Sequence, residues 1–175
     1  MKNNPIVVLA SARCPSDTQA FAQTVLAHTP HDVVNLLHAN VHPYRYDGAY
    51  PPDDTFMTIV QQLHQYPAIV LATPVYWYAM SGLLKTFFDR LTDLVTVAKP
   101  QGRLLRGKHL FLLAVGAEAE LPPGFETPFS STAAYFSMSF GGSLYHSPKN
   151  PARPTAQAFV QQQFTERLAA ACQVS

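Results

Sequence analysis

Hydrophobic residues along the chain follow two spacings that alternate from one end to the other. Five short runs are rich in Val, Ile, Leu or aromatic residues, at positions 6–10, 32–36, 68–73, 109–115 and 143–146. Between them lie longer stretches in which apolar residues recur every three or four positions. Short β-branched runs predict strands, whereas the wider spacing predicts helices that bury one face. The alternation therefore predicts an α/β fold in which helices connect the strands of a parallel sheet.

The predicted strands differ in how completely they are apolar. Residues 6–10, 68–73 and 109–115 are almost continuously apolar, which is typical of strands covered on both faces. Residues 32–36 and 143–146 are shorter and more polar, as expected nearer the edges of a sheet. We therefore expect the first three at the centre of the sheet.

The helical spacing predicts five helices, over residues 17–28, 54–65, 81–95, 128–138 and 155–171. The first has a defined start, because Ser16 is a favourable N-cap and Gln19 completes a capping box. Asp53 and Asp54 precede the second and carry the negative charge that a helix N-terminus favours. Residues 37–52 fit neither spacing, and an irregular stretch of that length is usually functional or part of an interface.

Five parallel strands joined by helices allow few right-handed arrangements. The commonest at this length is a flavodoxin-like three-layer sandwich with strand order 2-1-3-4-5. We expect residues 1–175 to form one such domain. Ligands of these sheets bind beyond the carboxyl ends of the strands, near the switch in strand order. The loops after the first, third and fourth strands are therefore the places to search for a site.

Composition narrows the classes of function. The chain of 175 residues is 47% hydrophobic but only 13% charged, with a net charge of +1. Few charges on a folded surface favour an oligomer, and a near-neutral balance argues against nucleic-acid binding. The two cysteines, Cys14 and Cys172, are too few for a disulfide framework or a four-cysteine metal site. With no apolar run long enough for a membrane helix or a secretory signal, we expect a soluble cytoplasmic protein.

The loop after the first strand is rich in groups that bind anions. Ser11, Ser16 and Thr18 offer hydroxyls and Arg13 a cation, directly before a predicted helix N-terminus. Together they suit a phosphate monoester, although Ser16 as a plain helix cap and Arg13 as a solvated side chain explain the segment equally well. The glycine-rich motifs of dinucleotide and nucleoside triphosphate sites are missing, so neither is the expected tightly held ligand.

The loop after the third strand carries three consecutive aromatic residues, Tyr76, Trp77 and Tyr78. Three in a row cannot all face one core, so we interpret them as a rim for a flat heterocycle. In the loop after the fourth strand, Gly116 and the small residues beside it would let backbone approach a ring. A simple turn from strand to helix explains that third loop as well.

Three segments resemble those of a known family. They are Ser11-x-Arg13-x-x-Ser16-x-Thr18, then Thr73-Pro74-Val75-Tyr76-Trp77 leading into Ser81-Gly82-Leu83-Leu84-Lys85-x-Phe87-x-Asp89-Arg90, and Phe140-Gly141-Gly142. In this order they resemble the flavodoxin-fold NAD(P)H-dependent FMN reductases and their relatives among quinone reductases and iron-sulfur flavoproteins. The middle segment is the most specific of the three.

The resemblance implies an FMN-dependent oxidoreductase that takes hydride from NADPH or NADH and reduces a small acceptor such as a quinone or flavin. The chemistry would occur at flavin N5, so no catalytic side chain is expected. The implied cofactor-binding residues are Ser11, Arg13, Ser16, Asp17 and Thr18 for the phosphate and Pro74, Val75, Tyr76, Trp77, Tyr78, Gly116, Ala117 and Glu118 for the ring. It also implies a homodimer, or a tetramer, with helix 81–95 in the interface.

The chain departs from the family in two places. Asp17 stands where relatives often have Asn, and its carboxylate would repel phosphate if it faced inward. Residues 40–54 lack the clustered cysteines of the iron-sulfur branch, so we expect no cluster there. The tyrosines of that segment, Tyr44, Tyr46 and Tyr50, would then cover a flavin of the same or a partner subunit. His38 and His42 lack an evident third ligand, and no metal is expected.

Three alternatives remain open at this point. A flavodoxin-type electron carrier would bind FMN but dock on proteins, and such carriers are usually strongly acidic, unlike this chain. A module without enzymatic activity, with or without flavin, would keep the same fold. Cys14 lies near a helix start and an arginine, conditions that lower a thiol pKa, so either a redox role or simple packing is compatible with its position.

Overall fold

A computed structural model describes residues 2–151 and 153–173. Its centre is a sheet in which five parallel strands follow the order β2-β1-β3-β5-β6. Their bounds are β1 Ile6–Leu9, β2 Asp32–Asn35, β3 Ala68–Tyr76, β5 His109–Val115 and β6 Ser139–His146. A short strand, β4 (Ala79–Met80), turns back antiparallel to the end of β3. Leaving out this addition, the expected order 2-1-3-4-5 and the flavodoxin-like class are confirmed.

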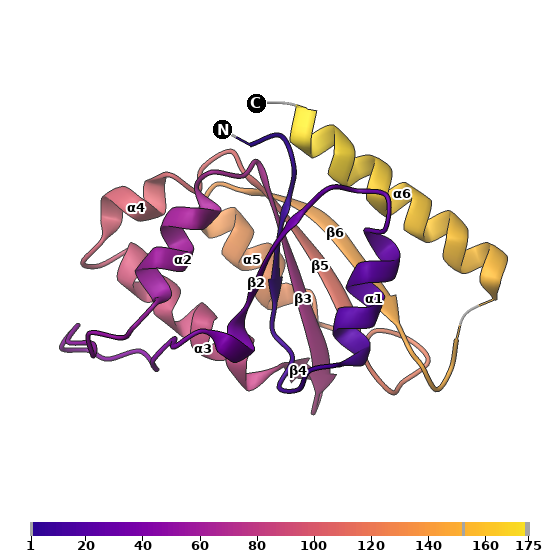
Figure 1. The fold of residues 1–175 in the computed structure, drawn as a ribbon, viewed down its shortest axis with the longest axis horizontal. Helices are drawn as coiled ribbons and strands as arrows, with labels where there is room; N and C mark the ends of the chain where they lie inside the picture. Colours follow the sequence, from indigo (N-terminus) through magenta and orange to yellow (C-terminus); the bar gives the residue numbers. More distant parts are fainter. Residues whose placement is uncertain (1, 152, 174–175) are drawn as a thin grey trace.

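Helices cover both faces of the sheet (Figure 1). On one face lie α1 (Asp17–Val25) and α6 (Pro154–Gln173). On the other lie α2 (Phe56–Leu63), α3 (Gly82–Arg90) and α5 (Thr127–Tyr135). The remaining helical pieces are η1 (Leu36–His38), η2 (Leu91–Leu94) and α4 (Lys99–Arg103). None of the helices in the described ranges combines the length and apolarity needed to cross a membrane.

The central strands form as expected because their side chains are buried on both sides. Val7 and Leu9 of β1 pack under α1 and α6, whereas Ile6 and Val8 pack under the helices of the opposite face. Burying a side chain of this size contributes about 1.5–3 kcal/mol each. The alternation explains why these strands must be apolar at every position.

Two of the helix boundaries that differ from the expectation lie beside one arginine. The helix predicted over 81–95 ends at Arg90 and continues as the tighter turn η2. Arg90 donates from Nε to Asp93 Oδ2 at 2.8 Å, and the Asp93 carbonyl accepts from the amides of 97 and 98. The helix predicted over 54–65 begins at Phe56 instead, and the Asp54 side chain bonds Arg90. Asp54 therefore pairs with the arginine and also places its negative charge near the start of α2.

Arg90 also holds the irregular segment 39–55 against the body of the molecule. Its guanidinium is 1% exposed and forms two bonds to the Asp54 carboxylate, at 2.6 and 3.0 Å. It donates to the His42 carbonyl at 3.0 Å and lies 3.4 Å from the centre of the Tyr50 ring. Tyr50 in turn donates its hydroxyl to Asp93 at 3.1 Å. We call Arg90, Asp54, Asp93 and Tyr50 the buried arginine cluster.

The glycines of one family-like segment lie inside β6. The strand predicted over 143–146 begins earlier, at Ser139, and includes Gly141 and Gly142. A Cβ on Gly141 would overlap the ring of Phe111, so this position is glycine for close packing within the sheet. Gly142 pairs with Phe111 in the first half of β5, and Gly141 lies at the register irregularity just before it, so both are away from the strand ends where ligands bind.

Candidate functional site

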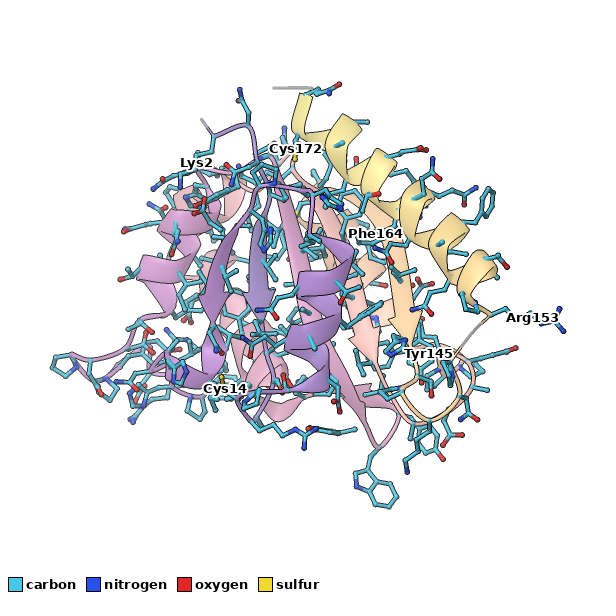
Figure 2. All side chains as sticks on the ribbon, turned by 45° about the vertical axis from the view of Figure 1, so that its right-hand side comes forward. Lys2, Cys14, Tyr145, Arg153, Phe164 and Cys172 are labelled. Atoms are coloured by element: carbon cyan, nitrogen blue, oxygen red, sulfur yellow. The ribbon has the colours of Figure 1, made fainter. Side chains whose placement is uncertain are left out.

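A hollow of about 450 Å³ opens at the carboxyl ends of the parallel strands. We call it the main hollow, and it is lined by Ser11, Arg13, Ser16, Asp17, Thr18, Pro74, Val75, Tyr76, Val115, Gly116, Ala117, Pro148 and Lys149. In Figure 2 this end of the sheet carries the labels Cys14 and Tyr145, and Lys2 and Cys172 mark the opposite end. Ten of the thirteen residues predicted for a cofactor are brought together here. The three others are Trp77, Tyr78 and Glu118.

The loop between β1 and α1 presents donors to the main hollow. Ser16 is the N-cap of α1, as expected, and its Oγ accepts from the Gln19 amide at 3.1 Å. Only this half of the capping box forms, because the Gln19 side chain bonds the Cys14 thiol instead. The first amides of a helix have no acceptor within it, which leaves those of Asp17 and Thr18 for an anion. Ser11 and Thr18 are 3% and 2% exposed, so folding fixes their positions.

Arg13 and Asp17 form an ion pair at the rim of the main hollow. Arg13 Nη2 donates to Asp17 Oδ2 at 2.9 Å, and both side chains are more than half exposed. The Asp17 carboxylate therefore lies beside the arginine instead of standing alone at the helix start. The pair contributes no net charge to the hollow.

A buried hydroxyl network joins the first loop to the loop after β3. Ser81, the N-cap of α3, donates its Oγ to the Ala10 carbonyl at 2.6 Å and accepts from the Leu84 amide. The Ser81 amide donates to Thr73 Oγ1 at 3.1 Å. Two neighbouring strand ends and the start of α3 are thus held in one arrangement. Ser81 was predicted only as part of a family-like segment. The signal that identifies it as an N-cap is its position directly before an apolar helical run.

The aromatic segment after β3 is a hairpin whose turn lies outside the main hollow. Tyr76 pairs with Ala79, and the two residues between them, Trp77 and Tyr78, have positive φ angles of 49° and 64°. This is the turn geometry that Asn and Gly usually supply, so bulky residues are strained there. Trp77 is 94% exposed. Strain of this kind is concentrated at functional sites.

Tyr78 lines a neighbouring hollow of about 370 Å³, which we call the hairpin hollow. Its other walls are Ala79, Met80, Lys85, Phe88, Asp89, Gly124, Phe125 and Pro128. Most of this lining is apolar, and the Lys85–Asp89 ion pair of α3 belongs to it. The two hollows therefore flank one aromatic hairpin.

The loop after β5 requires glycine at one position. A Cβ on Gly116 would lie 2.7 Å from Tyr145 Oη and 3.1 Å from the Val75 Cβ, so any larger residue would displace the wall of the main hollow. Burial raises the pKa of Tyr145, whose hydroxyl donates to the Glu118 carbonyl at 2.8 Å. Glu118 thus contacts Tyr145 of β6 through its backbone and is not among the residues that line the hollow.

The loop after β6 completes the main hollow and was not among the loops searched in the sequence. It contributes Pro148 and Lys149. Ser147 Oγ and Asn150 Nδ2 both donate to the Ala117 carbonyl, at 3.2 and 3.0 Å, which fixes this turn against the loop after β5. The rule that ligands bind beyond strand ends points to this loop as much as to the other three.

The main hollow fits a molecule that has a phosphate at one end and a flat ring at the other. Hydroxyls and helix amides gather in the first loop, while Pro74, Val75 and Tyr76 supply a wall that is mainly apolar. Gly116 keeps backbone close to the ring position. FMN has both parts, so the donor set and the glycine are compatible with it. In the described ranges no group of three or more His, Cys, Asp or Glu side chains is arranged to hold a metal ion.

Comparisons with known proteins agree with this geometry. Residues 5–121 match the family described as NADPH-dependent FMN reductase. The chain is 30% identical over 101 residues to a protein named as an NAD(P)H-dependent FMN-containing oxidoreductase, YwqN, of Bacillus subtilis strain 168, which covers 54% of this chain and 55% of that protein. It is 31% identical over 81 residues to an FMN-dependent NADH:quinone oxidoreductase of Burkholderia thailandensis, covering 42% and 40%.

A solved structure extends the likeness to nearly the whole fold. It is an NADPH-quinone reductase from P. pentosaceus, with a TM-score of 0.63 and 21% identity over 98% of this chain and 99% of that one. At this identity the likeness shows the fold. The chain spans about half the length of the curated relatives that it matches. Since the family match covers residues 5–121, which include three of the four loops of the main hollow, the chain belongs to the NADPH-dependent FMN reductase family.

Proposed function

We propose that the protein is an FMN-dependent oxidoreductase that takes hydride from NADPH or NADH and passes the electrons to a small acceptor such as a quinone or a flavin. The observation that carries this proposal is the main hollow, where anion donors and an aromatic hairpin meet at the carboxyl ends of adjacent parallel strands. Membership of the NADPH-dependent FMN reductase family supports FMN as the cofactor and a nicotinamide nucleotide as the hydride donor.

The residues of the chain have binding and orienting roles in this proposal. Ser11, Ser16 and Thr18, with the first amides of α1, hold the FMN phosphate. Pro74, Val75 and Tyr76 form the wall against the ring, and Gly116 permits its close approach. FMN held by these residues would supply the redox chemistry between the nicotinamide and the acceptor. The protein contributes position and the exclusion of water.

Trp77, Tyr78 and Glu118 have a different place in the proposal from the one expected. Trp77 and Tyr78 form the hairpin turn next to Tyr76, which lines the main hollow, and in this proposal they cover the ring from outside. Glu118 acts through its carbonyl, which fixes Tyr145 behind Gly116. Tyr44, Tyr46 and Tyr50 lie on the segment 39–55, where Tyr50 is bound to Arg90 and Tyr46 is 96% exposed.

Two further parts of the proposal concern assembly and location. We propose a homodimer through α3 and η2, the segment expected as helix 81–95, supported by Leu83 and Phe88 of α3, which are only partly buried, Phe88 lining the apolar hairpin hollow. Sedimentation at several protein concentrations checks it, and a monomer throughout contradicts it. We propose a cytoplasmic location, supported by two free thiols, one of them exposed.

The decisive experiment is to record the visible spectrum of the purified protein with and without added FMN, and then to add NADPH or NADH under anaerobic conditions. We expect bound FMN that is bleached by the nicotinamide alone and reoxidised by a quinone. An electron carrier would bind FMN but require a reductase protein for fast bleaching. A protein that is colourless after incubation with FMN and removal of the unbound flavin would contradict both the oxidoreductase and the carrier.

A further inference from the structure

The charge at the main hollow presents a problem for binding a phosphate. A phosphate monoester carries close to two negative charges at neutral pH. Arg13, the cation predicted for it, is already paired with Asp17 at 2.9 Å. Hydroxyls and helix amides supply donors but only partial positive charge. The segment expected to bind the anion is therefore close to neutral.

Lys149 is the second cation in the lining of the main hollow. In the ranges 2–151 and 153–173, the ion pairs of the structure include none with Lys149. Its charge is therefore uncompensated, unlike that of Arg13. Pro148 before it and Asn150 after it belong to a turn tied to the Ala117 carbonyl and to Ser147 Oγ, so the backbone of Lys149 is held in place.

The end of β6 lies against the helix that provides the phosphate donors. His146, the last residue of β6, stacks on Phe21 of α1 with ring centres 5.1 Å apart and planes 19° apart. Lys149 follows three residues later, and the lining of the main hollow joins it to Ser16 and Thr18 at the start of α1. The lysine and these donors thus line the same hollow, the lysine from the loop after β6.

We propose that Lys149 binds the 5′-phosphate of FMN and supplies the positive charge that the Arg13–Asp17 pair lacks. This inference rests on the proposed function, since it takes FMN as the occupant. The ammonium and the phosphate oxygens form a charge-assisted hydrogen bond, which is stronger than one between neutral groups. A consequence is that Lys149 discriminates between FMN and riboflavin, which has the same ring without the phosphate.

The test is a fluorescence titration of the apoprotein with FMN and, separately, with riboflavin. For Lys149→Gln we expect FMN to bind about tenfold more weakly, the loss typical of one charged hydrogen bond that is partly exposed. Riboflavin affinity should change less than twofold. Lys149→Arg should keep most of the FMN affinity. Lys99→Gln, which removes the same charge from the exposed surface of α4, is the matched control and should bind FMN like the wild type.

Salt gives a second measurement of the same contact. Mobile ions screen an exposed charge pair. When the salt concentration is raised from about 0.05 to about 0.5 M, the FMN affinity of the wild type should therefore fall more steeply than that of Lys149→Gln. The riboflavin affinity of both proteins should be nearly independent of salt. Circular dichroism of the variants verifies that the fold is unchanged.

Three outcomes overturn the inference. The first is an FMN affinity of Lys149→Gln equal to that of the wild type. The second is an equal loss for FMN and riboflavin, which would indicate a structural role. The third is that Lys149→Gln keeps its FMN affinity but loses affinity for NADPH and not for NADH, relative to the wild type. That result would assign the lysine to a phosphate of the dinucleotide. Failure of the proposed function has different signatures: either the wild type itself binds no FMN, or it binds FMN that the nicotinamide alone does not bleach, and the second result leaves these titrations unchanged.

Discussion

Two arginines of this chain each bond an aspartate, and the comparison between them separates stability from function. Arg13 meets Asp17 at 2.9 Å, and Arg90 meets Asp54 at 2.6 Å. The distances are similar, but Arg13 is 65% exposed and Arg90 only 1%. The surroundings of the two pairs, and not their lengths, decide what each pair does.

Removing any member of the buried arginine cluster should destabilise the fold. Arg90 is shared between two buried carboxylates, which together carry one negative charge more than the arginine balances. The Tyr50 hydroxyl and the His42 amide supply the extra hydrogen bonds. By contrast, water solvates both members of the Arg13–Asp17 pair, so either can be removed at little cost or redirected toward a ligand. Burial therefore holds the Arg90–Asp54 pair in place, whereas exposure leaves the Arg13–Asp17 pair able to bind a ligand.

The largest expected effect is on stability when Arg90 is replaced. Arg90→Met keeps much of the side-chain volume but leaves two buried carboxylates unpaired, which should cost about 3–5 kcal/mol in the free energy of unfolding. Arg13→Met should change it by less than about 0.5 kcal/mol. Urea unfolding followed by circular dichroism measures both.

A milder variant keeps this comparison testable where Arg90→Met fails to fold. Tyr50→Phe removes only the hydroxyl that donates to Asp93, and it should cost about 1 kcal/mol. Equal stabilities of the Arg90 and Arg13 variants, or a neutral Tyr50→Phe, would show that the buried cluster does not stabilise the fold.

The second effect is a loss of stability in acid. Burial raises the pKa of Asp54, but the hydrogen bonds from Arg90 and the His42 amide outweigh it and leave this pKa below its ordinary value of 3.8. Since the folded state binds this proton only at lower pH than the unfolded state, the stabilisation is complete above about pH 4 and declines below it. Asp32 behaves alike, because bonds from Lys2, Asn4 and Tyr66 lower its pKa to about 2.

Urea unfolding of the wild type and of Asp54→Asn at several pH values checks this. The variant should be less stable at neutral pH and should lose less on acidification. Asp53→Asn, at the exposed neighbouring carboxylate, is the matched control and should follow the wild type. Parallel acid profiles for Asp54→Asn and the wild type would remove Asp54 from the explanation.

The smallest effect is expected at the exposed pair, and it has opposite signs for stability and binding. Asp17→Asn removes a negative charge from the first turn of α1 and should lower stability by about 0.3–1 kcal/mol. It also frees Arg13 toward the main hollow, so FMN should bind more tightly, by roughly fivefold at most. Thermal unfolding and FMN titration measure the two. Weaker FMN binding would instead make Asp17 a direct contributor to the site.

The sequence predicts the fold well because burial constrains the central strands at every position. Residues 6–10, 68–73 and 109–115 became β1, β3 and β5 with small shifts at their ends. The helix ends were less predictable. That of α3 depends on Arg90, whose partners Asp54 and His42 lie 36 and 48 residues away, and no local pattern encodes such contacts.

The candidate site was predicted in part, for a similar reason. The loops after β1 and β3 have local signals, namely a serine cap and three aromatic residues, and the main hollow unites most of these positions. Lys149 has no such signal, because a lysine after a strand looks like any solvated residue until the fold brings it into the lining of the main hollow. The spacing of Arg13 and Asp17 in the sequence allows them to pair. Only the structure shows that Asp17 would compete with a ligand phosphate for this arginine. Whether these residues bind FMN stays a prediction.

The hairpin turn gives the molecule a built-in optical probe. Trp77 is the single tryptophan among the 175 residues, and it is 94% exposed on a strained turn between two hollows. Indole emission shifts and quenches when the ring leaves water or meets an electron acceptor. Any cofactor, acceptor or second subunit that covers the hairpin therefore alters one well-defined fluorescence signal, and occupancy of the site can be followed in the unmodified protein without a label.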